Sequence, residues 1–201
     1  MKILCLYNNS CAVPLFNWLQ QEGHTIILVS ERLTKSWCRD QKVDLTVSYT
    51  YRYILPDEIL DALQNNVVNL HNSLLPWNRG SDPNLWSIIT HTPRGVTLHY
   101  VDAGLDKGAI IAQQLVPLRL GDTLRTSYNA LDAAAKTLFQ QAFQWYPYWP
   151  YMKKRPEGEG SYHSTADGEF LRKSISSYDM TVEEFRCHIN ARGEANALYS
   201  C

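Results

Sequence analysis

The stretch that decides the fold is "VVNLHNSLLPWNRGSDPNLW", Val67 to Trp86. Apolar strand formers lead to Asn69 and His71, and a polar loop punctuated by Pro and Gly follows at once. In an extended strand, residues two apart project to the same side, so this amide and this imidazole can face one cleft. A strand that ends in polar groups and breaks into a loop is typical of the carboxyl edge of an open α/β sheet, where ligands bind.

Strand and helix patterns alternate on both sides of this stretch. The apolar runs predict strands over residues 2–7, 25–30, 44–49, 67–73, 95–101 and 109–118. Helical spacing and end signals predict helices over residues 10–24, 55–63, 84–91, 123–145 and 181–192. We therefore expect an α/β fold, a Rossmann-like open, mostly parallel sheet with helices on both faces. Residues 1–146 are expected to form this domain, and residues 147–201 a short C-terminal extension with small helical and β elements.

Composition argues against several classes of protein. Of the 201 residues, 45% are hydrophobic and 19% charged, and the net charge of -1 argues against a nucleic-acid-binding surface. No apolar run approaches the roughly 20 residues of a membrane span, and the start turns polar too soon for a signal peptide. We therefore expect a cytoplasmic protein without membrane insertion. The five cysteines are scattered without C-x-x-C, which indicates reduced thiols rather than disulfides or a zinc site.

The candidate chemistry is a set of three side chains: Asn69, His71 and Asp106. Asp106 lies in the turn-rich loop "VDAGLDKGAI". An imidazole accepts protons near neutral pH, a carboxylate can fix its tautomer, and an amide N–H can stabilise an oxyanion. These roles suit attack on a carbonyl carbon. Ser73 lacks a G-x-S-x-G setting, so the attacking group is expected to come from the substrate.

Other interpretations of these residues remain open. A histidine at a strand end is more often structural than catalytic. His71, His99 and Asp106 would also make a two-His-one-carboxylate metal set, but His99 lies mid-strand without the spacing of a ligand, so no metal is expected. No phosphate-binding glycine motif follows the first strand, where the sequence is "LYNNSCAVP". This argues against a dinucleotide-binding site, despite the alternation of strands and helices.

"NLHNSLLPWNRGSDPNLWSI" followed by "GVTLHYVDAGLDKGAIIAQQ" resembles the 10-formyltetrahydrofolate-dependent formyltransferase family. The resemblance runs over residues 44–120. It implies formyl transfer with 10-formyltetrahydrofolate as the donor and Asn69, His71 and Asp106 as the active-site trio. It also implies that "SYTYRYILPDEIL" and the "VDAGLD" loop bind the pterin, which assigns the donor to Tyr51, Arg52, Tyr53, Ile54, Leu55, Val101, Asp102 and Ala103.

Within this family, the chain is most similar to the sugar N-formyltransferases. The methionyl-tRNA enzymes carry an additional C-terminal barrel, and the deformylases an additional N-terminal domain, for which this sequence has no room. "GSYHSTADGEFL" resembles the Tyr-His-x-x-x-Asp segment of the sugar enzymes, which act on dTDP- or UDP-linked amino sugars of surface glycans such as O-antigen. The alternatives are a phosphoribosylglycinamide formyltransferase, a formyltetrahydrofolate hydrolase and a non-catalytic folate-binding module. A homodimer through the C-terminal part is plausible.

Substrate contacts are expected at the end of the first strand and in the loop after His71. Turn formation explains Asn8 and Asn9 equally well. A solvated basic loop explains Lys153, Lys154 and Arg155, which could otherwise bind a nucleotide-sugar diphosphate. The predicted substrate-binding residues are Asn8, Asn9, Ser73, Leu74, Trp77 and Arg79.

Overall fold

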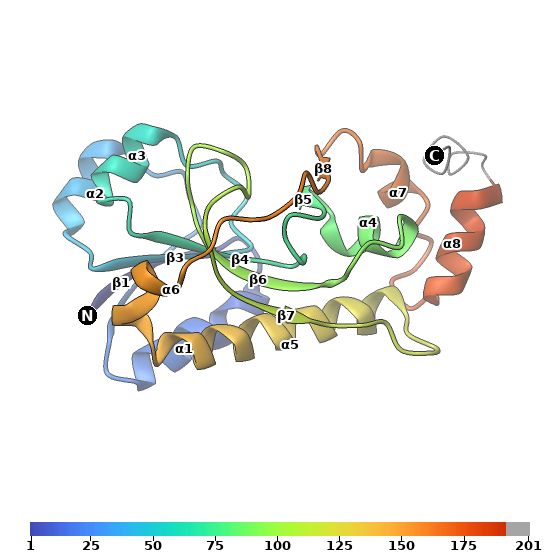
Figure 1. Ribbon diagram of the computed structural model, residues 1–201, viewed down its shortest axis with the longest axis horizontal. Coiled ribbons are helices and arrows are strands. Elements are labelled where there is room, and N and C mark those ends of the chain that lie inside the picture. The colour runs from blue at the N-terminus through green and yellow to red at the C-terminus, as the bar shows by residue number, and fades with distance from the viewer. Residues whose placement is uncertain (192–201) are drawn as a thin grey trace.

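A six-stranded open sheet forms the centre of the molecule (Figure 1). The computed structural model describes residues 1–191. The strand order is β2-β1-β3-β4-β6-β7. The first four strands are parallel, β6 is antiparallel to β4, and β7 is antiparallel to β6. This arrangement confirms the predicted Rossmann-like sheet, whose strands are β1 (Lys2–Leu6), β2 (Thr25–Val29), β3 (Leu45–Tyr49), β4 (Val67–His71), β6 (Gly95–Tyr100) and β7 (Ile110–Leu115).

Helices cover both faces of the sheet, as predicted (Figure 1). On one face α1 (Val13–Gln21), after the short 3-10 helix η1 (Ser10–Ala12), and α5 (Leu124–Phe143) pack into the largest apolar cluster. On the other face lie α2 (Lys35–Gln41) and α3 (Asp57–Ala62). The sequence pattern did not predict α2, because this helix is short and is stabilised by packing against α3.

A second apolar cluster lies beside the carboxyl end of the main sheet. It joins α4 (Pro83–Ile89) to α7 (Glu169–Lys173) and α8 (Val182–Ala191). A two-strand ladder of β5 (Arg79–Gly80) and β8 (Tyr162–His163) links the loop after β4 to the C-terminal part. Within residues 1–191, no helix combines the length and the apolar character needed to span a bilayer.

The aromatic segment after α5 packs partly into the main core. η2 (Tyr146–Tyr148) and α6 (Trp149–Met152) follow α5 directly. Although Trp149 falls in the expected extension, its side chain is fully buried in the main cluster, and its indole N–H donates to the carbonyl of Ala142 at 2.9 Å.

Trp149→Ala is expected to lower the free energy of unfolding by about 3–5 kcal/mol, because it leaves a large cavity in a close-packed core. Urea unfolding followed by circular dichroism measures the change. The matched control is Trp145→Ala, since the Trp145 side chain is 56% exposed. A loss of equal size in both variants would contradict the placement of Trp149 in the core.

Candidate active site

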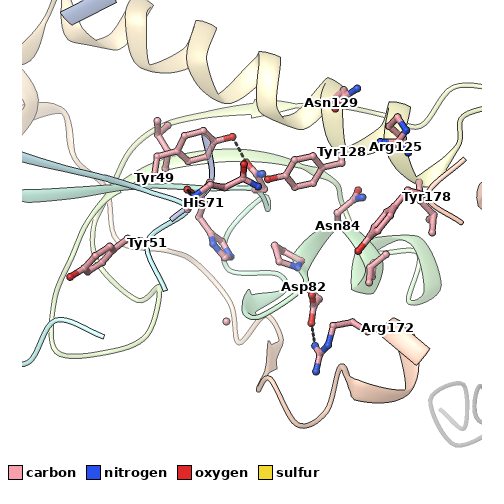
Figure 2. A pocket seen from close by; sticks show the side chains of 18 of the residues that line it. Tyr49, Tyr51, His71, Asp82, Asn84, Arg125, Tyr128, Asn129, Arg172 and Tyr178 are labelled. Atoms are coloured by element: carbon pink, nitrogen blue, oxygen red, sulfur yellow. Dashed lines mark hydrogen bonds and ion pairs between the residues drawn. The ribbon is translucent and has the colours of Figure 1, made fainter. Parts of the chain in front are cut away.

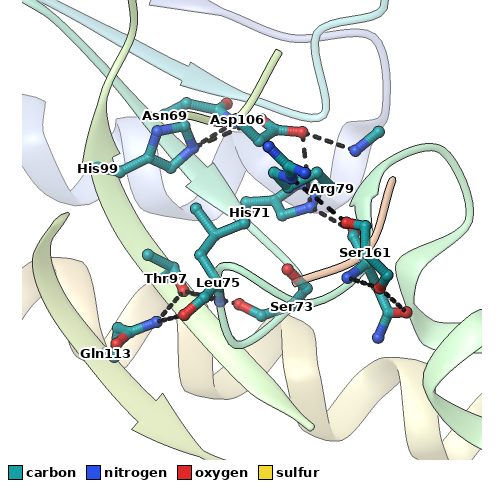
Figure 3. A network of polar contacts seen from close by, with 12 residues as sticks. Asn69, His71, Ser73, Leu75, Arg79, Thr97, His99, Asp106, Gln113 and Ser161 are labelled. Atoms are coloured by element: carbon teal, nitrogen blue, oxygen red, sulfur yellow. Dashed lines mark hydrogen bonds and ion pairs between the residues drawn. The ribbon is translucent and has the colours of Figure 1, made fainter. Parts of the chain in front are cut away.

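Asn69 and His71 lie at the carboxyl end of β4, and both side chains line the same cavities. The antiparallel pairing of β4 with β6 places His99 directly opposite Asn69. The pairing of β6 with β7 shifts register between Leu98 and His99, and such bulges redirect neighbouring side chains. Figure 3 shows the rings of His71 and His99 turned toward the carboxylate of Asp106.

Asp106 reaches this edge from the loop after β6, so the structure brings the predicted trio together. Its backbone lies in the left-handed region at φ 50°. Its carboxylate accepts a 2.9 Å hydrogen bond from the Gly80 N–H and lies 3.7 Å from Nε2 of His71 and 3.5 Å from Nε2 of His99. Burial by itself raises the pKa of Asp106, but the two imidazoles and the Gly80 N–H outweigh burial and hold the pKa below its ordinary value. Asp106 is therefore ionised at neutral pH.

A backbone carbonyl holds the ring of His71. Nε2 of His71 lies 3.1 Å from the carbonyl oxygen of Asn78, and because a carbonyl only accepts, this nitrogen carries a proton and donates it. Asp106, at 3.7 Å from the same nitrogen, is beyond hydrogen-bond distance. Nδ1 makes no hydrogen bond to residues 1–191, so in the neutral ring it is the nitrogen free to accept a proton. We expected the carboxylate to fix the tautomer, and in the structure the Asn78 carbonyl makes that contact.

His99 fixes the amide of Asn69. Nδ1 of His99 donates to the carbonyl of Tyr100 at 2.9 Å, which leaves Nε2 of the neutral ring to accept from Nδ2 of Asn69 at 3.3 Å. One N–H of the Asn69 amide is thereby engaged and the other is free for a ligand. Sequence reasoning considered His99 only as a metal ligand. No group of three or more His, Cys, Asp or Glu side chains within residues 1–191 has the geometry of a metal site.

The first of two cavities that meet at this site is the loop cavity, with a volume of about 520 Å³. One wall is the segment 51–55 and the other is the segment 101–106, so both predicted folate-binding segments line one space. Asn69, His71 and His99 close one end. Several of the wall residues are exposed, among them Ile54 at 67%, and an apolar side chain displayed in this way is suited to contact a flat ring.

The second is the helix cavity, with a volume of about 570 Å³, between β4 and the helices α4 and α5. Both cavities are lined by Tyr51, Asn69, His71 and Gly80, so two residues of the predicted trio lie where the two spaces meet. In Figure 2, Arg125 and Tyr178 lie at the opposite end of the helix cavity from Tyr51.

The helix cavity contains residues that sequence reasoning did not single out. Arg125, the second residue of α5, pairs with Asp179 at 2.6 Å, and Arg172 of α7 pairs with Asp82. Tyr178 lies beside them in the lining and is 57% exposed. No motif marks these residues, because segments distant in sequence bring them together.

The two predicted asparagines after β1 lie near the site in different roles. Asn8 braces the segment 51–55, because its side-chain oxygen accepts from the N–H of Arg52 at 2.8 Å and its Nδ2 donates to the carbonyl of Ser30 at 2.7 Å. Asn9 lines the helix cavity, and its side-chain oxygen accepts from the N–H of Cys11 at 3.0 Å.

The predicted substrate residues of the loop after β4 lie outside both cavities. Ser73 is 2% exposed, and Leu74 packs against Gly95 of β6. Trp77 is 37% exposed but lines neither space. The guanidinium of Arg79 donates to carbonyls of the segment 159–161 and lines a third hollow, beside the segment 153–159, which shares Asp102 and Asp106 with the loop cavity.

Comparisons with known proteins agree with this geometry. A family model described as formyl transferase matches residues 28–143. The formyltransferase PseJ from Anoxybacillus kamchatkensis, solved with UDP-4,6-dideoxy-4-formamido-L-AltNAc and tetrahydrofolate, is 34% identical, with a TM-score of 0.81 over 92% of this chain and 97% of that chain. Rv3404c from Mycobacterium tuberculosis, considered a sugar N-formyltransferase, is 26% identical, with a TM-score of 0.76 over 92% of this chain and 85% of that chain.

A 4-N formyltransferase from Francisella tularensis is 20% identical, with a TM-score of 0.74 over 93% of this chain and 85% of that chain, and supports the fold alone. The family model spans more than half of the chain, and the 34% identity extends over nearly all of it. Asn69, His71 and Asp106 at the carboxyl edge of the sheet thus lie in a protein whose sequence and fold are both those of one enzyme family. This chain belongs to the formyl transferase family.

Proposed function

We propose that this enzyme transfers the formyl group of 10-formyltetrahydrofolate to the amine of a UDP- or dTDP-linked amino sugar. The observation that carries the proposal is the meeting of two cavities at Asn69 and His71. A transferase that moves a group directly between two substrates needs both reacting atoms at one point, and this geometry provides one space for each substrate.

The loop cavity is suited to the donor. It lies between the segments 51–55 and 101–106, and its polar end carries the trio. A pterin inserted between these walls places N10 and its formyl group toward Asn69 and Asp106. Tetrahydrofolate is bound in the 34% identical PseJ structure, which supports this assignment.

The helix cavity is suited to an anionic acceptor. Arg125 and Arg172 line it, and guanidinium groups bind phosphate oxygens in a bidentate manner. The Arg125–Asp179 pair is more than half exposed, and such pairs contribute little, so a diphosphate can replace the carboxylate. Arg94 is buried behind the cavity wall and donates to Oδ1 of the lining residue Asn84 at 2.9 Å. Burial lowers the pKa of Arg94 to about 10, so it stays charged at neutral pH. We therefore assign the diphosphate to Arg125 and Arg172 rather than to Arg79.

The proposed reaction is direct acyl transfer. The lone pair of the sugar amine attacks the formyl carbon, and the carbonyl electron pair moves to oxygen, where the free N–H of Asn69 stabilises it by an amount on the order of 3 kcal/mol. Nδ1 of His71 takes the proton that leaves the amine and returns it to N10 as the C–N10 bond breaks. The ionised Asp106 stabilises the imidazolium formed in between. The products are a formamido sugar and tetrahydrofolate.

The proposal extends to the setting of the reaction. Nucleotide-linked formamido sugars suit the assembly of surface glycans such as O-antigen, in the cytoplasm where folate donors are present. A homodimer is proposed through the aromatic segment after α5, where Trp145, Tyr148 and Tyr151 are each more than half exposed.

The test is incubation with 10-formyltetrahydrofolate and a panel of UDP- and dTDP-linked 4-amino sugars, with products read by mass spectrometry. The expected product has gained one CO, and one tetrahydrofolate is released for each. Transfer to glycinamide ribonucleotide, or tetrahydrofolate release without any acceptor, would instead support the phosphoribosylglycinamide enzyme or the hydrolase. Tight folate binding with no turnover would support a binding module.

Arg125→Ala is expected to raise the KM of the nucleotide sugar by about tenfold, the loss of one charge-assisted contact, while the KM of the folate donor stays unchanged. Steady-state kinetics with each substrate varied in turn measures both constants. Arg79→Ala is the contrasting variant, because its guanidinium lies outside both cavities. A greater loss of acceptor affinity in Arg79→Ala than in Arg125→Ala would contradict the placement of the diphosphate.

A further inference from the structure

Residues 159–164 lie outside the region matched by the family model, yet their backbone forms hydrogen bonds with the loop after β4. The Arg79 N–H donates to the carbonyl of Ser161 at 3.0 Å, and the Ser161 N–H donates to the carbonyl of Pro76 at 3.1 Å. The Ser81 N–H donates to the carbonyl of His163 at 2.9 Å. Figure 3 shows Ser161 beside this loop, close to the ring of His71. The C-terminal segment therefore supports the backbone that surrounds the catalytic imidazole.

The residue held most firmly by this segment is Asn78. It is fully buried, and its backbone lies in the left-handed region at φ 53°, which residues other than glycine adopt less readily, although asparagine tolerates it better than most. Its N–H donates to Oγ of Ser161 at 2.8 Å, and that hydroxyl in turn donates to Oδ1 of Asn78 at 3.2 Å. Nδ2 of Asn78 donates to Oγ1 of Thr92 at 2.8 Å. A strained backbone of this kind persists only where its surroundings fix it.

We propose that Ser161 is a positioning residue for formyl transfer, because it fixes Asn78 so that the Asn78 carbonyl holds the Nε2–H of His71 and leaves Nδ1 to accept the proton. Ser161 lines neither the loop cavity nor the helix cavity, so it acts through Asn78 and not on a substrate. The kinetic consequence rests on the proposed function. The tautomer of His71 is a property of the protein alone and does not depend on the acceptor.

Removal of the Ser161 hydroxyl leaves two buried polar groups of Asn78 without their partner, the N–H and Oδ1. A buried unpaired group is costly, so the backbone relaxes from its left-handed conformation toward one that satisfies it. The carbonyl then turns away from Nε2, and the ring of His71 is no longer restricted to one tautomer. Because a proton on Nδ1 blocks the nitrogen that must accept one, kcat falls while both substrates still bind.

The kinetic arm of the test is Ser161→Ala. We expect kcat to fall by about 10- to 100-fold, with the KM of each substrate unchanged. Ser161→Thr retains a hydroxyl and is expected to restore most of the rate. The matched control is Ser174→Ala, which removes another buried hydroxyl of the C-terminal part, one that donates only to the carbonyl of Phe170. A loss in KM rather than in kcat for Ser161→Ala would overturn the positioning role.

The structural arm is long-range ¹⁵N–¹H NMR of the histidine rings, with the His71 signals identified by their absence in His71→Asn. Wild-type His71 is expected to carry its proton on Nε2, and Ser161→Ala to show the Nδ1–H form or a mixture. An Nδ1–H tautomer in the wild-type protein would overturn the inference. So would a Ser161→Ala variant in which kcat changes without a change of the His71 tautomer, or the tautomer changes without a change of kcat. Ser161→Cys replaces the alanine variant if that does not fold. Failure of the proposed function is distinguishable, because wild-type protein would then transfer no formyl group.

Discussion

Replacing His71 with Asn is expected to reduce kcat for formyl transfer by about 10²- to 10⁴-fold, the usual contribution of a positioned acid–base group. Asparagine is shorter than histidine, so its amide lies at the level of Nδ1 and does not reach the Asn78 carbonyl that Nε2 contacts. The neutral amide also cannot act as a base at the position of Nδ1. The free N–H of Asn69 remains, so residual activity above the uncatalysed rate is expected. Single-turnover formation of the formamido product, measured with saturating donor, gives the rate directly.

The control for this variant is a histidine remote from the site. His188→Asn changes an exposed residue of α8 and is expected to keep full activity. Tetrahydrofolate affinity, measured by calorimetry, should be the same in both variants, because the loop cavity retains its walls. Activity of His71→Asn within tenfold of wild type, with its fold and folate affinity intact, would remove His71 from the proton transfer.

Much of the fold is predictable because its signals are local. The helix predicted over 123–145 is observed as Leu124–Phe143, since Thr123 caps its start and its apolar residues recur at helical spacing. The helix Lys35–Gln41 is not predictable in this way, because its sequence offers few apolar residues and its stability comes from α3. The ladder between Arg79–Gly80 and Tyr162–His163 depends on segments about 80 residues apart and has no local pattern.

The same distinction applies to the candidate site. Asn69 and His71 are predictable because a strand with period two turns both to one side, and Asp106 follows from the family resemblance. The position of His99 opposite Asn69 depends on the register of β6 against β4, and this register cannot be predicted from the sequence. Asn78 contributes through its backbone carbonyl, a group that every residue carries, and so no residue type identifies it.

Asp106→Asn is expected to lower kcat by about 10²- to 10⁴-fold, because the amide keeps the shape of the carboxylate but cannot stabilise an imidazolium. The neutral amide can still accept from the Gly80 N–H, so the loop after β6 should keep its position. Donor and acceptor KM values therefore stay close to wild type, and the loss lies in kcat. A variant that keeps its kcat within tenfold of wild type would show that the charge of Asp106 is not used in the reaction.

The same substitution gives a test through stability, with a definite sign. The pKa of Asp106 in the folded protein lies below its ordinary value, so the ionised carboxylate stabilises the fold above the ordinary aspartate pKa of about 3.9. That contribution is lost as the pH falls toward the lower pKa of the folded state, and Asp106→Asn never has it. The difference in free energy of unfolding between wild type and variant is therefore expected to shrink as the pH is lowered from neutral to below about 4. Urea unfolding of both proteins across this range measures the difference. If the difference in free energy of unfolding stays constant or widens as the pH falls, the two imidazoles and the Gly80 N–H do not hold an ionised carboxylate at this site.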